Sequence, residues 1–224
     1  MNYQNGEQTG WQRRYLLPDR DIDSADPCIL AAVQELTRNC RTDKEKASSI
    51  FYFVRDKITY NMYPKNTRRG GYCASFVLQQ KEGWCLQKSI LAAALFRASG
   101  IPARLCFAEL INHALNRKSY EAIGTNHFSP HTYVEIYLGE NWIPVTPVFP
   151  EDLCRRLQVP AVEFDGVHPA MLSSVDLAGG PYMEYISKSP GCDVVPWERI
   201  IQESKRVYGE KSTLWFSEDF MKEL

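Results

Sequence analysis

Apolar positions in the first half of the chain recur with helical spacing. After Thr42 the apolar side chains fall on one helix face, at Ala47, Ile50, Phe51, Val54 and Ile58. Thr42 and Glu45 match a capping box at the start of this run, because their side chains can satisfy the free N–H groups of a first turn. An earlier helix is predicted over Pro27–Cys40, with Asp26 as its N-cap.

The longest helical pattern follows Cys85. Apolar and small residues recur from Leu86 to Arg97, and Gly100 and Pro102 end the run. The apolar face is wide and rich in alanine, so the pattern predicts a central helix packed closely on a sheet. Shorter helices are predicted over residues 75–80, 151–157 and 196–208.

Strand patterns occupy the middle of the chain. Residues 103–108 alternate between apolar and polar, and His131–Leu138 and Trp142–Thr146 flank a Gly-Glu-Asn turn, which is typical of a hairpin. The polar segment from Ile111 to Pro130 leads into the strand of His131, so we expect it to be a loop that lines or covers the site. The first ten or so residues are polar and are expected to be loose.

The order of these elements predicts an α+β fold, with helices first, then an antiparallel sheet, then irregular chain. The pattern shows no internal repeat and no linker between domains. We therefore expect one domain over residues 1–224. Its core would span about residues 27–150, and residues 151–224 would form a C-terminal extension that wraps the core.

Composition narrows the possible functions. The chain has 224 residues, a hydrophobic content of 44% and a formal net charge of -1, so its charge does not favour nucleic acid as a partner. The longest apolar stretch is too short to span a membrane, and the N-terminus lacks an apolar signal region, which favours the cytoplasm. The seven cysteines show neither CxxC nor zinc-finger spacing, so we expect no metal and no cofactor.

Cys85 stands where a nucleophile could be activated. The free N–H groups and the dipole at a helix start lower the pKa of a thiol. His131 opens a strand and could accept the thiol proton from a rigid position. The hairpin should bring Thr146 near His131, at the place where a Cys-His-Asp site would have its carboxylate.

Two stretches of the chain resemble the transglutaminase-like superfamily, a branch of the papain-like cysteine fold. They are GWCLQKSILAAALFRASGIPARL around Cys85 and HTYVEIYLGENWIPVTP around His131. The resemblance covers roughly residues 76–150 and implies a papain-like α+β core whose central helix bears the cysteine. The later stretches EFDG and PYMEYI also resemble a bacterial subgroup of these proteins, one that has Thr in the usual Asp position.

The resemblance implies a role for each site residue. Cys85 would be the nucleophile and His131 the general base and acid, while the Asp position falls on Thr146. A hydroxyl can orient the imidazole but cannot supply a negative charge, so another group could take that part; the candidates are Asp165, Glu135 and Asn112. The oxyanion donors would be the N–H of Cys85 and a side chain upstream, either Gln79, at papain-like spacing, or Trp84.

Two functions remain open from the sequence. The first is a thiol-dependent acyl-transfer enzyme that hydrolyses or forms amides through a Cys85 acyl-enzyme, with a peptide, a protein or a small amide or thioester as substrate. The second is a catalytically weakened or inactive binding module, which the Thr146 departure favours. In that case Cys85 is a packing thiol. The cysteine spacing gives little support to a redox or metal protein.

Overall fold

The structure is a computed structural model and describes residues 10–223. The first nine residues, on which the expectation of a loose N-terminus mostly falls, lie outside the described residues. The N-terminal half is helical and has one short parallel strand pair. Its elements are α1 (Gly10–Arg13), α2 (Pro27–Thr37), α3 (Asp43–Lys57), β1 (Thr59–Tyr60), the 3-10 helix η1 (Arg69–Tyr72), α4 (Ala74–Gln80), β2 (Glu82–Gly83) and α5 (Cys85–Ala98).

The second half builds the main sheet and then returns to helices. A four-stranded antiparallel sheet has the order β5-β4-β3-β6. The register of its central pair sets Ala108 opposite His131. The elements are β3 (Ala103–Asn112), α6 (Arg117–Ile123), β4 (His127–Leu138), β5 (Asn141–Val145), α7 (Glu151–Leu157), β6 (Met183–Lys188), α8 (Trp197–Tyr208), the 3-10 helix η2 (Gly209–Leu214) and α9 (Glu218–Lys222).

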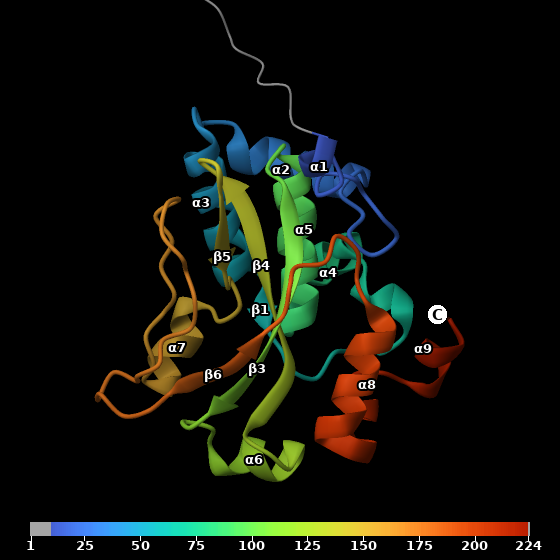
Figure 1. The fold of residues 1–224 in the computed structure, drawn as a ribbon, viewed down its shortest axis with the longest axis vertical. Helices are drawn as coiled ribbons and strands as arrows, with labels where there is room; N and C mark the ends of the chain where they lie inside the picture. Colours follow the sequence, from blue (N-terminus) through green and yellow to red (C-terminus); the bar gives the residue numbers. More distant parts are fainter. Residues whose placement is uncertain (1–9, 224) are drawn as a thin grey trace, which may run out of the picture.

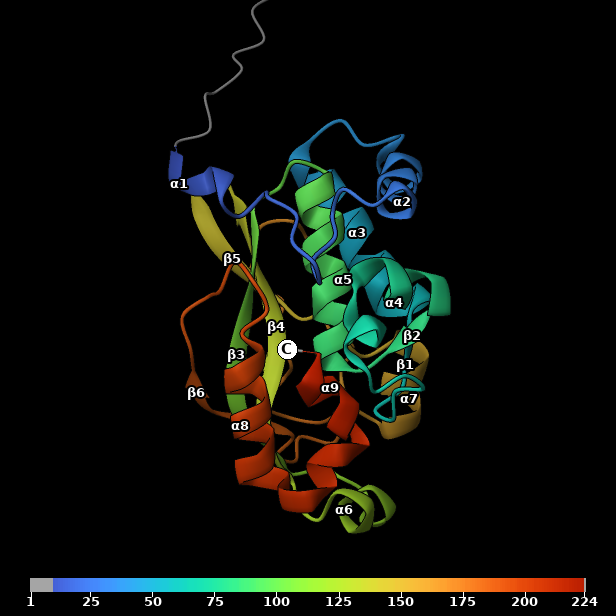
Figure 2. The ribbon, with the colours of Figure 1, turned by 90° about the vertical axis from the view of Figure 1, so that its right-hand side faces the viewer.

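Helix α5 forms the middle layer of the molecule. It contacts β3 and β4 on one side and α2, α3 and α4 on the other (Figures 1 and 2). Every residue from Cys85 to Arg97 is buried, as expected for a helix covered on all faces. The alanines at its centre let the helix lie close to the sheet, and Gly100 ends it with φ +86°.

Two polar side chains fix α5 to its neighbours. The ammonium of Lys88 is fully buried and donates to the backbone carbonyls of Arg55 (3.1 Å) and Ile58 at the end of α3. One residue later, the Ser89 hydroxyl donates to the carbonyl of Thr132 in β4 at 3.0 Å. The start of α5 is therefore held against both α3 and the strand that carries His131.

The C-terminal residues pack into the same core. Tyr72 of η1 stacks on Phe216 and meets Trp197 and Phe220 edge to face. These four aromatic side chains are buried. Helix α8 also contacts β4, and Figure 2 shows α8 and α9 beside the sheet and α5. Residues after 196 thus complete the hydrophobic interior that the helical half begins.

The α+β class with a central helix on an antiparallel sheet is confirmed, and so are the Asp26 cap and the Thr42 capping box. The segment 111–130 differs from the expected loop, because β3 and β4 both extend into it and α6 folds between them. Strand β6 was not predicted. It closes one edge of the sheet by pairing with β3, far away in sequence.

Candidate active site

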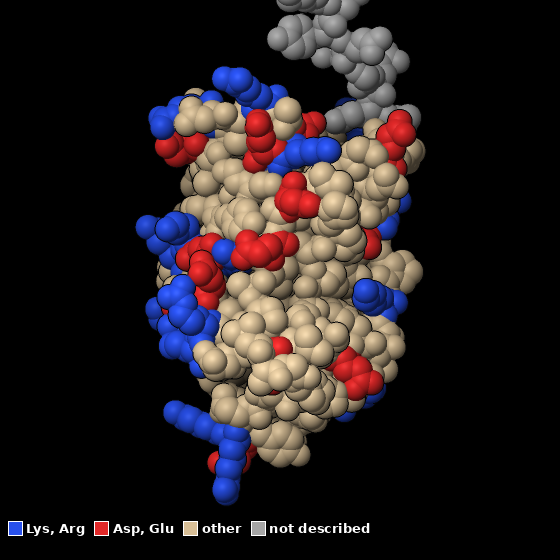
Figure 3. All heavy atoms as spheres, turned by 90° about the vertical axis from the view of Figure 1, so that its left-hand side faces the viewer, with Lys and Arg blue, Asp and Glu red and all other residues tan. Residues whose placement is uncertain are grey.

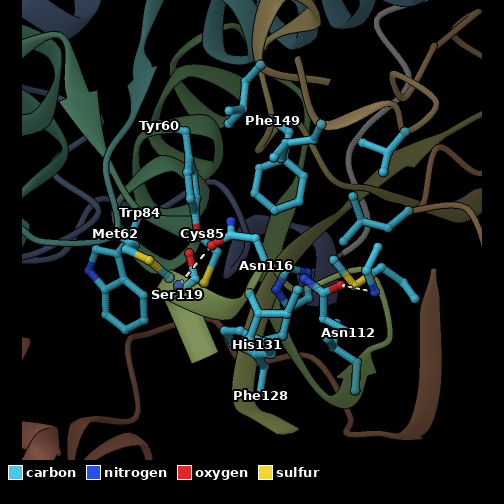
Figure 4. Close-up of a pocket in the computed structure, with 18 of the residues that line it drawn as sticks. Tyr60, Met62, Trp84, Cys85, Asn112, Asn116, Ser119, Phe128, His131 and Phe149 are labelled. Carbon is cyan, nitrogen blue, oxygen red and sulfur yellow. Dashed lines mark hydrogen bonds between the residues drawn. The ribbon is translucent and has the colours of Figure 1, made fainter. Parts of the chain in front are cut away.

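A cavity of about 350 Å³ opens at the start of α5. Its wall combines the end of β3, α6, the start of β4, α7, the start of β6 and the chain around Tyr208 and Trp215. Cys85 and His131 both line it (Figure 4). Two residues that the sequence places 46 positions apart therefore share one pocket, because α5 packs on β4.

Cys85 is the first residue of α5 and is 7% exposed. Burial raises the pKa of its thiol to about 11, although the N–H groups of Thr132, Leu86 and Cys85 itself act in the opposite direction. The sequence expectation of a lowered pKa therefore fails here. A helix start offers the thiolate hydrogen bonds and a favourable dipole, but the loss of water around the sulfur costs more.

His131 lies near the start of β4 and is 6% exposed. Burial lowers the pKa of its imidazole to about 4, and no charged group contributes to the shift. Among the described residues, the buried Nε2 atom has no hydrogen-bond partner. The ring is thus a neutral base at pH 7 with one nitrogen left unpaired.

The site therefore holds a neutral thiol and a neutral imidazole at pH 7. No hydrogen bond joins the two in the described structure, and such contacts often tighten only when a substrate is bound. A preformed thiolate–imidazolium pair is not favoured at this burial. The arrangement can instead support proton transfer from thiol to imidazole at the moment the sulfur attacks a carbonyl.

Thr146 follows the end of β5 and is fully buried. Its hydroxyl donates to the sulfur of Met171 at 3.3 Å, and its backbone N–H donates to the carbonyl of Ala170 at 2.8 Å. No hydrogen bond joins Thr146 to His131 in the described structure. The segment 170–171 therefore holds the residue in the usual Asp position, and the imidazole receives no charge from it.

Tyr185 of β6 is a neighbour of His131 that the sequence analysis missed. The two rings meet edge to face, 6.4 Å apart between centroids. Burial raises the pKa of Tyr185 to about 12, while the Leu172 N–H and the Thr146 hydroxyl lie near enough to act against this rise. Tyr185 lies in the PYMEYI stretch, but no local pattern there predicts that β6 pairs with β3, the neighbour of the strand that carries His131.

Three of the sequence candidates lie outside the pocket. Asp165 is on an exposed turn, where its carboxylate bonds to His168 Nδ1 at 2.6 Å. Backbone N–H groups and the His168 side chain lower the pKa of Asp165 well below its usual range. Glu135 pairs with Arg104. The exposed Gln79 points its amide at Cys28, 4.0 Å from the sulfur. The structure brings none of them to Cys85.

Asn112 and Trp84 do line the pocket. The side-chain oxygen of Asn112 accepts from the Ala114 N–H at 3.0 Å and does not bond to His131. The buried indole N–H of Trp84 has no partner with hydrogen-bond geometry among the described residues. It lies close enough to the Tyr72 hydroxyl to act against the rise that burial causes in the pKa of Tyr72. Of the upstream oxyanion donors named from the sequence, only Trp84 lies at the pocket.

The described residues contain no group of three or more His, Cys, Asp or Glu side chains that could hold a metal ion. In the same part of the chain, none of the helices combines the length and apolar character needed to cross a membrane.

Comparisons with known proteins agree with this architecture. The family model of the transglutaminase-like superfamily matches residues 31–147. Among solved structures, the chain is similar to a candidate cysteine protease from Cytophaga hutchinsonii, at 18% identity and a TM-score of 0.50 over 83% of this chain and 55% of that one. It is also similar to the periplasmic domain of TgpA from Pseudomonas aeruginosa, at 22% identity and a TM-score of 0.46 over 61% of this chain and 46% of that one.

The chain thus spans about half the length of each of these two structures. At 18% identity the first likeness concerns the fold. No curated protein matches the chain.

Proposed function

The chain belongs to the transglutaminase-like superfamily, and from that premise we propose that it is a thiol-dependent acyl-transfer enzyme. Cys85 is the nucleophile and His131 the general base and acid. The observation that carries the proposal is the shared pocket, in which a thiol at a helix start and a neutral imidazole on an adjacent strand line one wall. A peptide, a protein or a small amide or thioester supplies the acyl group.

In the first step, the Cys85 sulfur forms a bond to the carbonyl carbon while its proton passes to His131. The carbonyl oxygen becomes negative and accepts a hydrogen bond from the free N–H of Cys85 at the start of α5. The intermediate then expels the amine or thiol leaving group, which takes the proton from His131. Water or an amine resolves the acyl-enzyme by the reverse sequence.

The experiment uses acyl thioesters of N-acetylcysteamine, with intact-mass detection of acylated protein and peptide mapping to locate the acyl group. We expect the adduct at Cys85 and its absence in Cys85→Ala. In His131→Ala, acylation should slow by about 10²–10⁴-fold, which is the range for loss of a positioned base. Cys106→Ala and His113→Ala are the matched controls, because both residues lie outside the pocket, and they should react like the parent.

Adding a primary amine to the same assay distinguishes the two outcomes of the second step. Hydrolysis returns free enzyme and a carboxylic acid, whereas transamidation gives a new amide whose yield rises with the amine concentration. Acylation spread over several cysteines, with no dependence on His131, would contradict the proposal.

A binding module is the second candidate, and one observation favours it. The hydroxyl of Thr146 is engaged by Met171, and no carboxylate contributes to the pKa of His131. On this reading the pocket binds amides or peptides without reacting. The thioester assay separates the two candidates, because a binding module would give no acyl adduct. A ligand would instead protect its Cys85 from alkylation, which is measured separately.

A further inference from the structure

We propose that the pocket selects an uncharged acyl donor whose acyl part is bulky and apolar, such as an aromatic or long aliphatic acyl group carried by an amide or thioester. This inference rests on the proposed acyl transfer at Cys85 and adds the class of substrate. It comes from three features of the wall: its charge, its apolar sides and its hydrogen-bond donors.

The wall carries no ionic group. Among the described residues that line the cavity, none is Asp, Glu, Lys or Arg. Its only titratable base, His131, is neutral at pH 7. A charged acyl group would leave water without meeting a counter-charge, which is among the most costly events in binding. The chain as a whole has an ordinary charged content of 24%, so the uncharged wall is a property of the pocket and not of the composition.

Apolar side chains flank Cys85 on both sides. Trp84 and Met62 lie on one side of the sulfur, and Phe149 lies on the other (Figure 4). The Trp84 ring stacks on Trp215, with centroids 5.7 Å apart. A cavity of about 350 Å³ with such walls has the size and character of a small-molecule site. An acyl chain whose apolar atoms fill this cavity therefore binds there most favourably.

The apolar wall continues to the surface. Tyr63 and Leu157 line the cavity and are each 43% exposed. On the side of α7, a broad area below the middle of the surface carries few charged side chains (Figure 3), and the exposed Val175 and Leu177 belong to the chain that follows α7. Tyr63 and Leu157 thus extend the apolar wall of the cavity to the surface.

Three asparagines supply part of the polar wall, beside hydroxyl groups of Ser119 and of several tyrosines. Each of Asn61, Asn112 and Asn116 uses its side-chain oxygen to accept a backbone N–H of its own loop, at 2.9–3.0 Å. Their amide nitrogens have no partner among the described residues. These three side chains therefore offer N–H donors to a ligand. These suit the carbonyl oxygens of an uncharged amide or thioester.

The test compares acyl thioesters that share one leaving group. The panel contains 3-phenylpropanoyl, octanoyl, acetyl, succinyl and 4-(trimethylammonio)butanoyl groups. We expect 3-phenylpropanoyl and octanoyl to acylate Cys85 at least ~100-fold faster than the succinyl and cationic donors, with acetyl between them because it fills little of the cavity. Equal rates across the panel, or a preference for a charged donor, would overturn the inference.

An isosteric variant makes the charge argument specific. Asn116→Asp keeps the acceptor that caps α6, because Asp is as good an N-cap as Asn, and it places one negative charge on the pocket wall. We expect the cationic donor to gain about tenfold over the parent, and 3-phenylpropanoyl to lose about tenfold with the lost amide donor. Asn66→Asp is the matched control. It makes the same substitution at an asparagine whose oxygen also accepts a local backbone N–H, that of Arg68, outside this pocket, and its selectivity should equal that of the parent.

Binding to Cys85→Ala separates the inference from the proposed function. Quenching of Trp84 and Trp215 fluorescence by the N-methyl amides of the same acids reports occupancy without chemistry. Apolar amides binding to Cys85→Ala at least ~100-fold tighter than charged ones, with no acylation of Cys85 in the parent, would support the pocket's preference and refute acyl transfer. Acylation of Cys85 without selectivity, in contrast, would support acyl transfer and refute the pocket's preference.

Discussion

At the scale of single residues, the site depends on the balance between burial and charge. Cys85 has the helix-start position that favours a thiolate, yet burial raises its pKa to about 11. His131 shows the complementary effect, with its pKa lowered to about 4. Each shift favours the uncharged form of the group. The proposed reaction then depends on proton transfer from Cys85 to His131 within the substrate complex, since both groups are uncharged at rest.

This balance predicts a broad pH profile for acylation. His131 is in its basic form above a pKa of about 4, and Cys85 keeps its proton below a pKa of about 11. The rate constant kcat/KM for a thioester should therefore be flat from about pH 5 to 9 and fall on the acid side near pH 4. Stopped-flow measurement of thiol release gives the profile. An acid limb near 6.5, the ordinary pKa of histidine, would show that His131 is not buried as described.

Replacing Thr146 by Asp should move that acid limb. A carboxylate near the imidazole favours its charged form, and such neighbours shift a pKa by about 1–3 units. We expect the acid limb of Thr146→Asp to lie at higher pH than that of the parent by this amount. Thr146→Val is the matched control, because it keeps the shape without charge and should leave the limb in place. If the acid limbs of all three proteins coincide, the residue at position 146 does not affect the pKa of His131.

At the scale of elements, α5 carries a buried lysine that should make stability depend on pH. Burial lowers the pKa of Lys88 to about 7, whereas in the unfolded chain it is near 10.5. Between these values the unfolded state holds a proton that the folded state does not, so the free energy of unfolding rises with pH, by up to about 1.4 kcal/mol per pH unit. This contribution of Lys88 to the free energy of unfolding is lost as pH falls from about 10.5 to about 7.

Lys88→Met should remove this dependence. We expect the difference in unfolding free energy, parent minus variant, to increase from pH 7 to pH 10, as measured by urea unfolding. Lys57→Met is the control, because Lys57 is exposed at the end of α3, where the carbonyls that Lys88 contacts also lie, and its difference should stay constant. A constant difference for Lys88→Met as well would show that the ammonium stays protonated in the folded protein.

The elements also show what a sequence can predict. Local signals placed α2, α3, α5 and the hairpin, because caps, glycines and periodicity act over a few residues. Cys85 and His131 could be found in the same way. Strand β6 and Tyr185 could not, because they are fixed by pairing with a strand more than 70 residues away. Asp165 was named as a candidate site residue for a similar reason. The sequence predicts its turn, but it does not predict how far that turn lies from Cys85.

At the scale of the whole molecule, the aromatic cluster around Tyr72 joins the C-terminal residues to the N-terminal half of the chain. Phe220 is fully buried against Tyr72, Trp197 and Phe216, away from the pocket. Phe220→Ala should therefore lower the unfolding free energy by about 3–5 kcal/mol and shift a single calorimetric transition. Leu214→Ala, at a residue that is 38% exposed, should cost about 1 kcal/mol or less. A separate low-temperature transition in Phe220→Ala would instead mean that the C-terminal helices unfold alone.

The buried thiol also affects how long the protein lasts. Peroxides attack thiolates, and with a pKa of about 11 only about one Cys85 in ten thousand is ionised at pH 7. The residue should therefore survive peroxide exposure that converts an exposed, low-pKa cysteine to sulfenic acid and beyond. If Cys85 is the nucleophile that we propose, its low thiolate content at rest protects it from oxidation between reactions.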